Sequence, residues 1–483
     1  MKNFVPILVL FLLSNVLKAQ QQDFFYATMS KQHAQELAVE APDEIELIAT
    51  NNDIAAVRLS LEGSHLLHEK ILAHGPGYIY RTSEREALAV IQSNKRNVRA
   101  ETEFTISENE TVLDVIDRIN ITTIEEHIIE LENYGTRFHN TATGTQAAQD
   151  LKARWEAMAA TYNRSDVNVR LVEHTNTTMP SVVLTITGTT LPDEFVIVGG
   201  HLDSTSGQNQ TNAPGADDDA SGIATITEAT RALFEANFIP QRTIEIMAYA
   251  AEEIGLVGSN EIAQQYAANN VNVVAVAQFD MTLFNGSSND VSFVTDFTNE
   301  TLNNYMMSLL DHYNASGEHQ VTYGTSLCNY GCSDHASWTE QGYMASFPFE
   351  ANFGDHNGSI HSPNDTFNLI NTAAHSVKFA KLCAEFLIEI AKSDASSLGI
   401  NEEEEPFISL FVFNGKLIYD TSTSTKEYHK LKLYSLDGRL VIQQQVSRKK
   451  GEFNTPQLTT GVYIAALEST NGEVVTKKIV VKD

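Results

Sequence analysis

The 483-residue chain carries 32 Lys and Arg against 62 Asp and Glu, a formal net charge of −30. Nucleic acids and anionic membranes bind basic faces, so this charge argues against both as partners. With 42% hydrophobic residues the chain can build a packed core, and its length allows two or three domains.

Residues 1–19 have the pattern of a secretory signal peptide. Lys2 precedes an apolar run at 4–13, and the segment ends in the small residue Ala19. The run is too short for a membrane span, and no other run approaches that length, so we expect no membrane span. Leu17 departs from the usual small residue before the cleavage site, and a buried strand or helix is the alternative.

Residues 20–105 form a first unit, with apolar runs at 45–49 and 55–61 and a helical stretch at 84–91. We find no cluster of potential metal ligands in it. Exported hydrolases often carry a removable leader of this size, so the unit is a candidate propeptide. The alternative is a small structural domain that stays attached.

Residues 106–394 alternate helical and strand patterns. Helical periodicity at 123–134, 144–162, 221–236 and 258–268 accompanies apolar, β-branched runs at 182–186, 195–198, 243–249 and 273–279. This alternation predicts an α/β fold with a largely parallel mixed sheet. Because the strands are almost continuously apolar, we expect helices on both faces, in three α/β/α layers.

Residues 395–406 form an acidic linker that includes four consecutive glutamates at 402–405. Short strand patterns follow at 408–413, 430–434, 440–444, 462–467 and 474–481, separated by Asn-Gly and Asp-Gly turn signals. Residues 407–483 therefore read as a small all-β module.

Acidic and imidazole groups follow three of the predicted strands. His201 and Asp203 end the first, Glu252 and Glu253 the second, and Asp280 the third. Ligands of open α/β sheets bind at the carboxyl ends of the strands, so we expect these side chains to meet there.

Two further pieces complete the set. Asp217, Asp218 and Asp219 open a helical pattern; one such residue would read as an N-cap, but three in succession repel each other without a cation or donors. His361 lies in a polar loop, where His335 and His356 are its rivals, and alone it would read as a solvated histidine. Such a mixture of nitrogen and oxygen ligands suits zinc, and it exceeds the needs of one tetrahedral ion. Two ions about 3.5–4 Å apart would use all of them.

With these residues in view, the chain resembles the bacterial leucyl aminopeptidases, which are co-catalytic two-zinc exopeptidases. The resemblance covers residues 115–394 through the segments 199–204, 213–222, 248–253, 279–282, 328–338, 348–350 and 360–361. It implies two Zn²⁺ ions bridged by Asp218. His201 and Asp280 would complete one site, and Glu253 and His361 the other.

The resemblance also implies roles around the metals. Asp203 would accept the free ring N–H of His201, and Glu252 would be the general base for a hydroxide that bridges the zincs. Tyr330 would hold the developing oxyanion from a loop closed by a Cys328–Cys332 disulfide, and the peptide bond after Asp218 would be cis.

The pocket for the substrate's first side chain is expected to be apolar. Its residues would be Met281, Val294, Tyr330, Phe349, Phe353 and His356. This lining predicts preference for Leu, Met or Phe at the first position of peptides with a free N-terminus. His356 stands where close relatives have tyrosine.

The C-terminal module resembles the sorting domains of the type IX secretion system, on the acidic linker, a Gly-Val-Tyr-Ile pattern at 461–464 and the ending at 477–482. This implies passage through the periplasm of a Gram-negative bacterium, contact with the secretion machinery, and a final place outside the cell or on its surface. A β accessory domain that binds substrate or cell wall is the alternative. The absence of a heptad pattern favours a monomer.

Other functions remain open on the same fold. A glutaminyl cyclase-like acyltransferase would use a single zinc, a carboxypeptidase relative would need a basic residue for the substrate carboxylate, and a non-catalytic peptide-binding relative would lack a ligand or the base. The full ligand set, Glu252 and the 328–332 segment favour the aminopeptidase.

Overall fold

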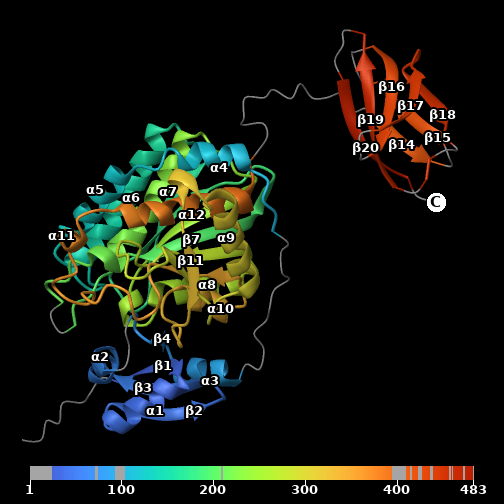
Figure 1. The fold of residues 1–483 in the computed structure, drawn as a ribbon. Coiled ribbons are helices and arrows are strands. Elements are labelled where there is room, and N and C mark those ends of the chain that lie inside the picture. The colour runs from blue at the N-terminus through green and yellow to red at the C-terminus, as the bar shows by residue number, and fades with distance from the viewer. Residues whose placement is uncertain are drawn as a thin grey trace, which may run out of the picture. The chain divides into compact units, whose positions relative to one another are not determined.

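A computed structural model describes residues 24–70, 74–92, 104–207, 210–393 and, in the C-terminal region, 409–413, 416–422, 427–435, 439–455, 458–459, 461–470 and 474–481 (Figure 1). The chain divides into two compact units, Met1–Asp394 and Ala395–Asp483. The predicted signal peptide at 1–19 and the acidic linker at 395–406 lie outside the described residues.

A small antiparallel sheet opens the first unit, and we call residues 24–92 the N-terminal sheet unit. Its strand order is β2-β3-β1-β4, and three helices accompany the sheet. The bounds are β1 Phe24–Ser30, α1 Lys31–Glu40, β2 Ile45–Thr50, β3 Ile54–Ser60, α2 Leu61–Lys70, β4 Tyr78–Arg81 and α3 Glu84–Gln92. The apolar runs at 45–49 and 55–61 and the helical stretch at 84–91 correspond to β2, β3 and α3, whereas β1, β4, α1 and α2 were not predicted.

The main sheet has six strands in the order β12-β9-β7-β8-β6-β5. Its bounds are β5 Val167–Val172, β6 Ser181–Ile186, β7 Leu191–His201, β8 Arg242–Tyr249, β9 Asn272–Gln278 and β12 Ala345–Ser346. Strands β12, β9, β7 and β8 pair in parallel, whereas β6 and β5 add antiparallel edges. The predicted largely parallel mixed sheet is confirmed.

Both faces of this sheet are buried, as the continuous apolar strands predicted. Val196 and Val198 of β7 join one hydrophobic cluster, whereas Ile197 between them joins another on the opposite face. Successive strand side chains point to opposite faces, so two clusters require two covering layers. Trp155 lies fully buried in the first cluster and Trp338 in the second.

Helices supply those layers (Figure 1). Their bounds are α4 Asn109–Ile116, α5 Ile121–Glu132, α6 Ala142–Thr161, α7 Gly222–Glu235, α8 Val257–Ala268, α9 Glu300–Tyr313, α10 His335–Glu340, α11 Phe367–Ile370 and α12 Ala374–Ala391. A second, three-stranded sheet contains β10 Val291–Val294, β11 Tyr323–Ser326 and β13 Pro348–Phe349. Within the described ranges, no helix is long and apolar enough to cross a membrane.

The C-terminal unit is built from strands, as predicted. Its two sheets have the orders β14-β15-β18 and β17-β16-β19-β20. The bounds are β14 Ser409–Phe413, β15 Lys416–Asp420, β16 Tyr428–Ser435, β17 Leu440–Gln445, β18 Lys450–Asn454, β19 Gly461–Ser469 and β20 Val474–Val481. Strands β15 and β18 were not predicted: β15 has only three apolar residues, between Lys416 and Asp420, and β18 has only Phe453.

Candidate metal centre

The ends of three neighbouring parallel strands build the centre. Strand β7 ends at His201, β8 leads into the short helical turn η2 (Glu252–Ile254), and Asp280 follows β9. Because β7 pairs with both β8 and β9, these three ends meet at one edge of the sheet. Ala251 and Met281 both have a φ of 58°, a left-handed backbone that turns the chain sharply beside each acidic side chain.

Asp218 stands between two histidines. Its Oδ1 lies 2.9 Å from His201 Nε2, and its Oδ2 lies 2.9 Å from His361 Nε2. His201 Nε2 is also 3.6 Å from Asp280 Oδ1, and His361 Nε2 is 3.2 Å from Glu253 Oε2. The five predicted ligands therefore come together as two groups that share one carboxylate. The Asp218–Asp219 peptide bond is cis, as the resemblance implied.

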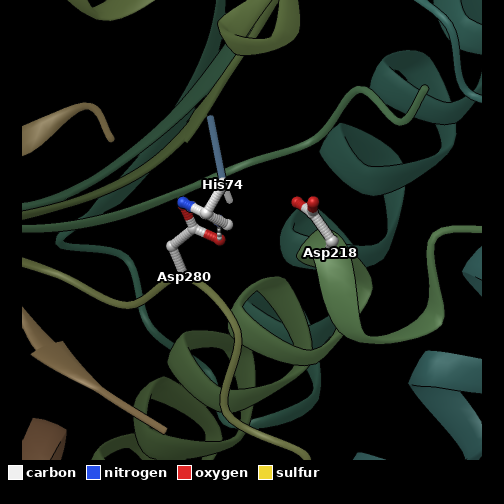
Figure 2. A group of neighbouring side chains, drawn as sticks. All are labelled: His74, Asp218 and Asp280. Carbon is white, nitrogen blue, oxygen red and sulfur yellow. Dashed lines mark ion pairs between the residues drawn. The ribbon is translucent and has the colours of Figure 1, made fainter. Parts of the chain in front are cut away.

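A sixth potential ligand comes from the N-terminal sheet unit. His74 is buried, and its Nε2 lies 3.6 Å from Asp280 Oδ1. Figure 2 shows its ring beside Asp280, with Asp218 across from both; ligand atoms of the three lie within 4.8 Å of one another. The sequence analysis found no cluster of metal ligands in residues 20–105, and among the described residues of that range the structure shows none either, but His74 joins the cluster of the metal centre.

Three more buried carboxylates hold the loops that carry these ligands, each by accepting backbone N–H groups. Asp219 accepts from His201, Gly222 and Met281 at 2.8–3.2 Å. Asp365 accepts from Asp217 and Asp218, both at 3.1 Å. The sequence analysis gave Asp365 no role.

Asp203 is the third of these supports, and its geometry differs from the expected one. Its carboxylate accepts the backbone N–H groups of Glu252 and Glu253 at 3.0 and 3.2 Å. His201 Nδ1 lies 3.0 Å from the backbone oxygen of Asp203 and 3.7 Å from its carboxylate. The backbone oxygen is thus the nearer acceptor for the His201 ring, and the carboxylate holds the η2 turn.

Glu252 is buried beside the ligands, and its Oε1 has no hydrogen-bond partner among the residues that the structure describes. Burial raises the pKa of Glu252 well above its ordinary value, with Glu253 adding to the rise and His201 opposing it. Burial also raises the pKa of Asp217 to about 6, behind the bridging carboxylate, where it contacts Asn357 at 3.0 Å. So many buried carboxylates need a positive charge in their midst.

The predicted pocket residues pack in one cluster. Met281, Val294, Tyr330 and Phe349 are buried together with Phe347 and the Cys328–Cys332 disulfide, and Phe353 packs against them from the edge. His356 contacts this group through Phe349, with ring centroids 5.8 Å apart. His335, a rival for the role of His361, instead stacks on Phe347.

The arrangement fits zinc. Ligands about 2.0–2.2 Å from a tetrahedral ion lie about 3.3–3.6 Å from each other, and the separations in both groups, 2.9–3.6 Å, are close to this. Asp280 Oδ1 and both carboxylate oxygens of Glu253 are buried with no hydrogen-bond donor in the described part of the chain. His201, Asp218 and Asp280 would hold one ion, and Asp218, Glu253 and His361 the other.

Comparisons with known proteins agree with this geometry. Residues 181–387 match Peptidase family M28, and residues 406–482 match the secretion system C-terminal sorting domain. The probable leucine aminopeptidase of Arthroderma benhamiae is 34% identical over 291 residues, covering 59% of this chain and 78% of that protein. A probable aminopeptidase of Saccharomyces cerevisiae is 31% identical over 299 residues, covering 60% and 78%.

Solved structures give the same result. The LapA aminopeptidase of Legionella pneumophila is 30% identical, with a TM-score of 0.67 over 77% of this chain and 99% of that one. LapB from the same organism is 28% identical, with a TM-score of 0.67 over 76% and 100%. The sorting domain marks the protein for the type IX system of Gram-negative bacteria, which secretes it or leaves it on the cell surface. The chain belongs to peptidase family M28, and it is a metalloaminopeptidase.

Proposed function

We propose that the protein is a two-zinc aminopeptidase that removes large hydrophobic residues, such as Leu, from the N-terminus of peptides. The observation that carries this proposal is the position of Asp218, whose two oxygens face two different histidines. A single-zinc enzyme would need only one of these groups.

Each residue has a role that its position supports. Bound zinc ions would activate a water and polarise the scissile carbonyl. Glu252 is buried with a raised pKa, and one of its oxygens has no hydrogen-bond partner among the described residues. It would take a proton from the attacking water and pass it to the leaving amine. Tyr330 would donate to the developing oxyanion, and the surrounding carboxylates would favour the substrate's ammonium group.

The cluster of Met281, Val294, Phe349 and Phe353 would receive the first side chain. Burying a Leu side chain there contributes about 1.5–3 kcal/mol, whereas a charged side chain would lose its hydration. Leu-linked substrates should therefore be cleaved faster than Asp- or Lys-linked ones, and equal rates would refute the pocket assignment.

We also propose the domain boundaries from the sequence: a signal peptide at 1–19, a propeptide at 20–105, the peptidase domain at 106–394, the linker at 395–406 and the sorting domain at 407–483. The mature enzyme would act as a monomer.

The test compares wild type with Glu252→Gln, using Glu126→Gln on the exposed face of α5 as the matched control. Zinc content and leucyl-anilide hydrolysis are measured before and after limited proteolysis of the N-terminal sheet unit. We expect about two zincs in all three proteins, and a kcat about 10²- to 10⁴-fold lower in Glu252→Gln alone.

Loss of zinc in Glu252→Gln would make Glu252 a ligand, and an unchanged rate would remove it from the mechanism. A Gln-initiated peptide that is cyclised rather than cut would favour the acyltransferase. One zinc per chain in the active wild type would refute the two-metal site.

A further inference from the structure

The loop between α2 and β4, of which residues 74–77 are described, reaches the metal centre. His74 brings its Nε2 to 3.6 Å from Asp280 Oδ1, the same oxygen that lies 3.6 Å from His201 Nε2. His74 Nε2 is buried and has no hydrogen-bond partner among the described residues. An imidazole nitrogen in this position faces the ion that His201, Asp218 and Asp280 would hold.

The other ring nitrogen is already engaged. His74 Nδ1 lies 3.0 Å from the backbone oxygen of Cys332, which can only accept a hydrogen bond. Nδ1 therefore carries a proton, and Nε2 is the nitrogen that faces the centre, where it can bind a metal once it is unprotonated. Metal-binding histidines are oriented by this kind of contact from the second nitrogen.

The same loop occupies groups that the substrate needs. The backbone N–H of His74 donates to Tyr330 Oη at 3.2 Å, and the Tyr330 hydroxyl donates to the backbone oxygen of His74. The His74 ring lies 5.5 Å from the ring of Phe349 and 6.3 Å from that of Phe353, centroid to centroid. The first side chain of a peptide cannot enter this pocket while His74 fills it.

The loop packs closely against Cys332, and contacts of the following strand β4 hold it in place. Gly75 has a φ of +63°, and a Cβ there would stand 2.4 Å from the backbone oxygen of Cys332. Beyond the loop, Tyr80 N–H donates to the Gly255 oxygen at 2.9 Å, and Arg81 pairs with Glu340 of α10 at 2.5 Å. These contacts fix strand β4, on the C-terminal side of the inserted histidine, against the rest of the first unit.

The N-terminal sheet unit also lines the space beside the centre. A cavity of about 680 Å³ has Glu253 and His361 in one wall and Phe25, Tyr78 and Tyr80 of the N-terminal sheet unit in another. The N-terminal sheet unit therefore borders the space that a bound peptide would need.

We propose that His74 is an internal ligand to the metal ion of His201, Asp218 and Asp280, and that it keeps the intact chain latent. The inference rests on the proposed zinc site and adds a ligand and a form of regulation to it. Removal of the N-terminal sheet unit would withdraw the imidazole, open the apolar pocket and release Tyr330.

The test uses the full chain loaded with Co²⁺, whose visible absorption reports its ligands. His74→Ala removes the imidazole, and Gly75→Val keeps it but displaces the loop by its clash with Cys332. Glu84→Ala, at an exposed position of α3 in the same unit, is the control. We expect both loop variants to change the Co²⁺ spectrum in the same direction and the control to match wild type.

Two further readouts accompany the spectrum. Chelation of the metal should speed proteolysis of the N-terminal sheet unit in wild type but not in His74→Ala. Leucyl-anilide hydrolysis by both loop variants should exceed wild type about 10- to 100-fold, because a blocked site is open only about 1–10% of the time. Proteolytic removal of the unit should bring wild type to the same rate.

The failures can be told apart. If wild type and His74→Ala bind metal with identical spectra and hydrolyse equally fast, His74 is not a ligand and the inference is overturned while the proposed function stands. If His74→Ala is folded but slower than wild type, His74 does not block the site. If no form binds metal or cleaves peptides, the proposed function itself fails.

Discussion

Replacement of Asp203 by Asn tests the idea that this carboxylate holds the turn that carries Glu252 and Glu253. Asp203 is fully buried, and it accepts the backbone N–H groups of both glutamates at 3.0 and 3.2 Å. Asn keeps the size of the side chain, but it offers one neutral oxygen and turns an NH₂ group toward the second N–H.

The magnitude follows from these two contacts. A hydrogen bond to a charged acceptor contributes about 1.5–3 kcal/mol, and an orphaned buried donor costs about 1–3 kcal/mol. One weakened bond and one lost bond together predict a loss of about 3–6 kcal/mol in the free energy of unfolding. A shift of about 1 Å in Glu252 would also lower kcat about 100-fold.

The assay is urea unfolding of the metal-free chain, followed by tryptophan fluorescence. The chain has 2 tryptophans, and both Trp155 and Trp338 are buried in the cores on either face of the main sheet, so the signal reports that part alone. The exposed Asp193→Asn is the control. An unfolding free energy within about 1 kcal/mol of wild type, together with an unchanged kcat at saturating zinc, would refute the role of Asp203.

Two other buried acids give separate predictions. Asp365→Ala should lower zinc affinity about 10- to 100-fold in a chelator competition, because the N–H groups of Asp217 and Asp218 lose their acceptor; an affinity equal to that of Asp193→Ala would contradict this. Burial raises the pKa of Glu385 on α12 to about 8 from 4.5. The folded chain keeps this proton over that window while the unfolded chain releases it, so stability falls as pH rises from 4.5 to 8. Between about pH 5 and pH 8, the free energy of unfolding of Glu385→Gln should rise relative to that of wild type by about 4 kcal/mol. A difference in urea unfolding between the two proteins that stays constant with pH would contradict this prediction.

Much of the fold and of the centre could be predicted because both depend on local pattern. Apolar strands that lead to His201, Glu253 and Asp280 can be recognised in the sequence itself, and parallel pairing brings the ends of these strands together. The contacts of Asp203 could not be predicted from local pattern. Whether the His201 ring contacts the backbone oxygen or the carboxylate of Asp203 depends on the turn after β8.

His74 lay beyond sequence reasoning for a different reason. The run His-Gly-Pro-Gly at 74–77 indicates a turn, but no periodicity states which surface a turn will meet. The surface that this turn meets depends on contacts such as that of Arg81 with Glu340, which join residues far apart in the chain. Only the packed structure brings the imidazole to Asp280.

The supporting carboxylates explain how so acidic a centre can form before a metal arrives. Asp219, Asp203 and Asp365 each accept backbone N–H groups of a neighbouring loop, and these hydrogen bonds offset part of the cost of burying the carboxyl groups. The ligand oxygens that remain, such as Asp280 Oδ1, have no such donors in the described ranges. Repulsion between carboxylates is therefore greatest at the ligand oxygens, where a cation or the His74 ring can relieve it. For this reason the site is selective for an ion and responds to the N-terminal sheet unit.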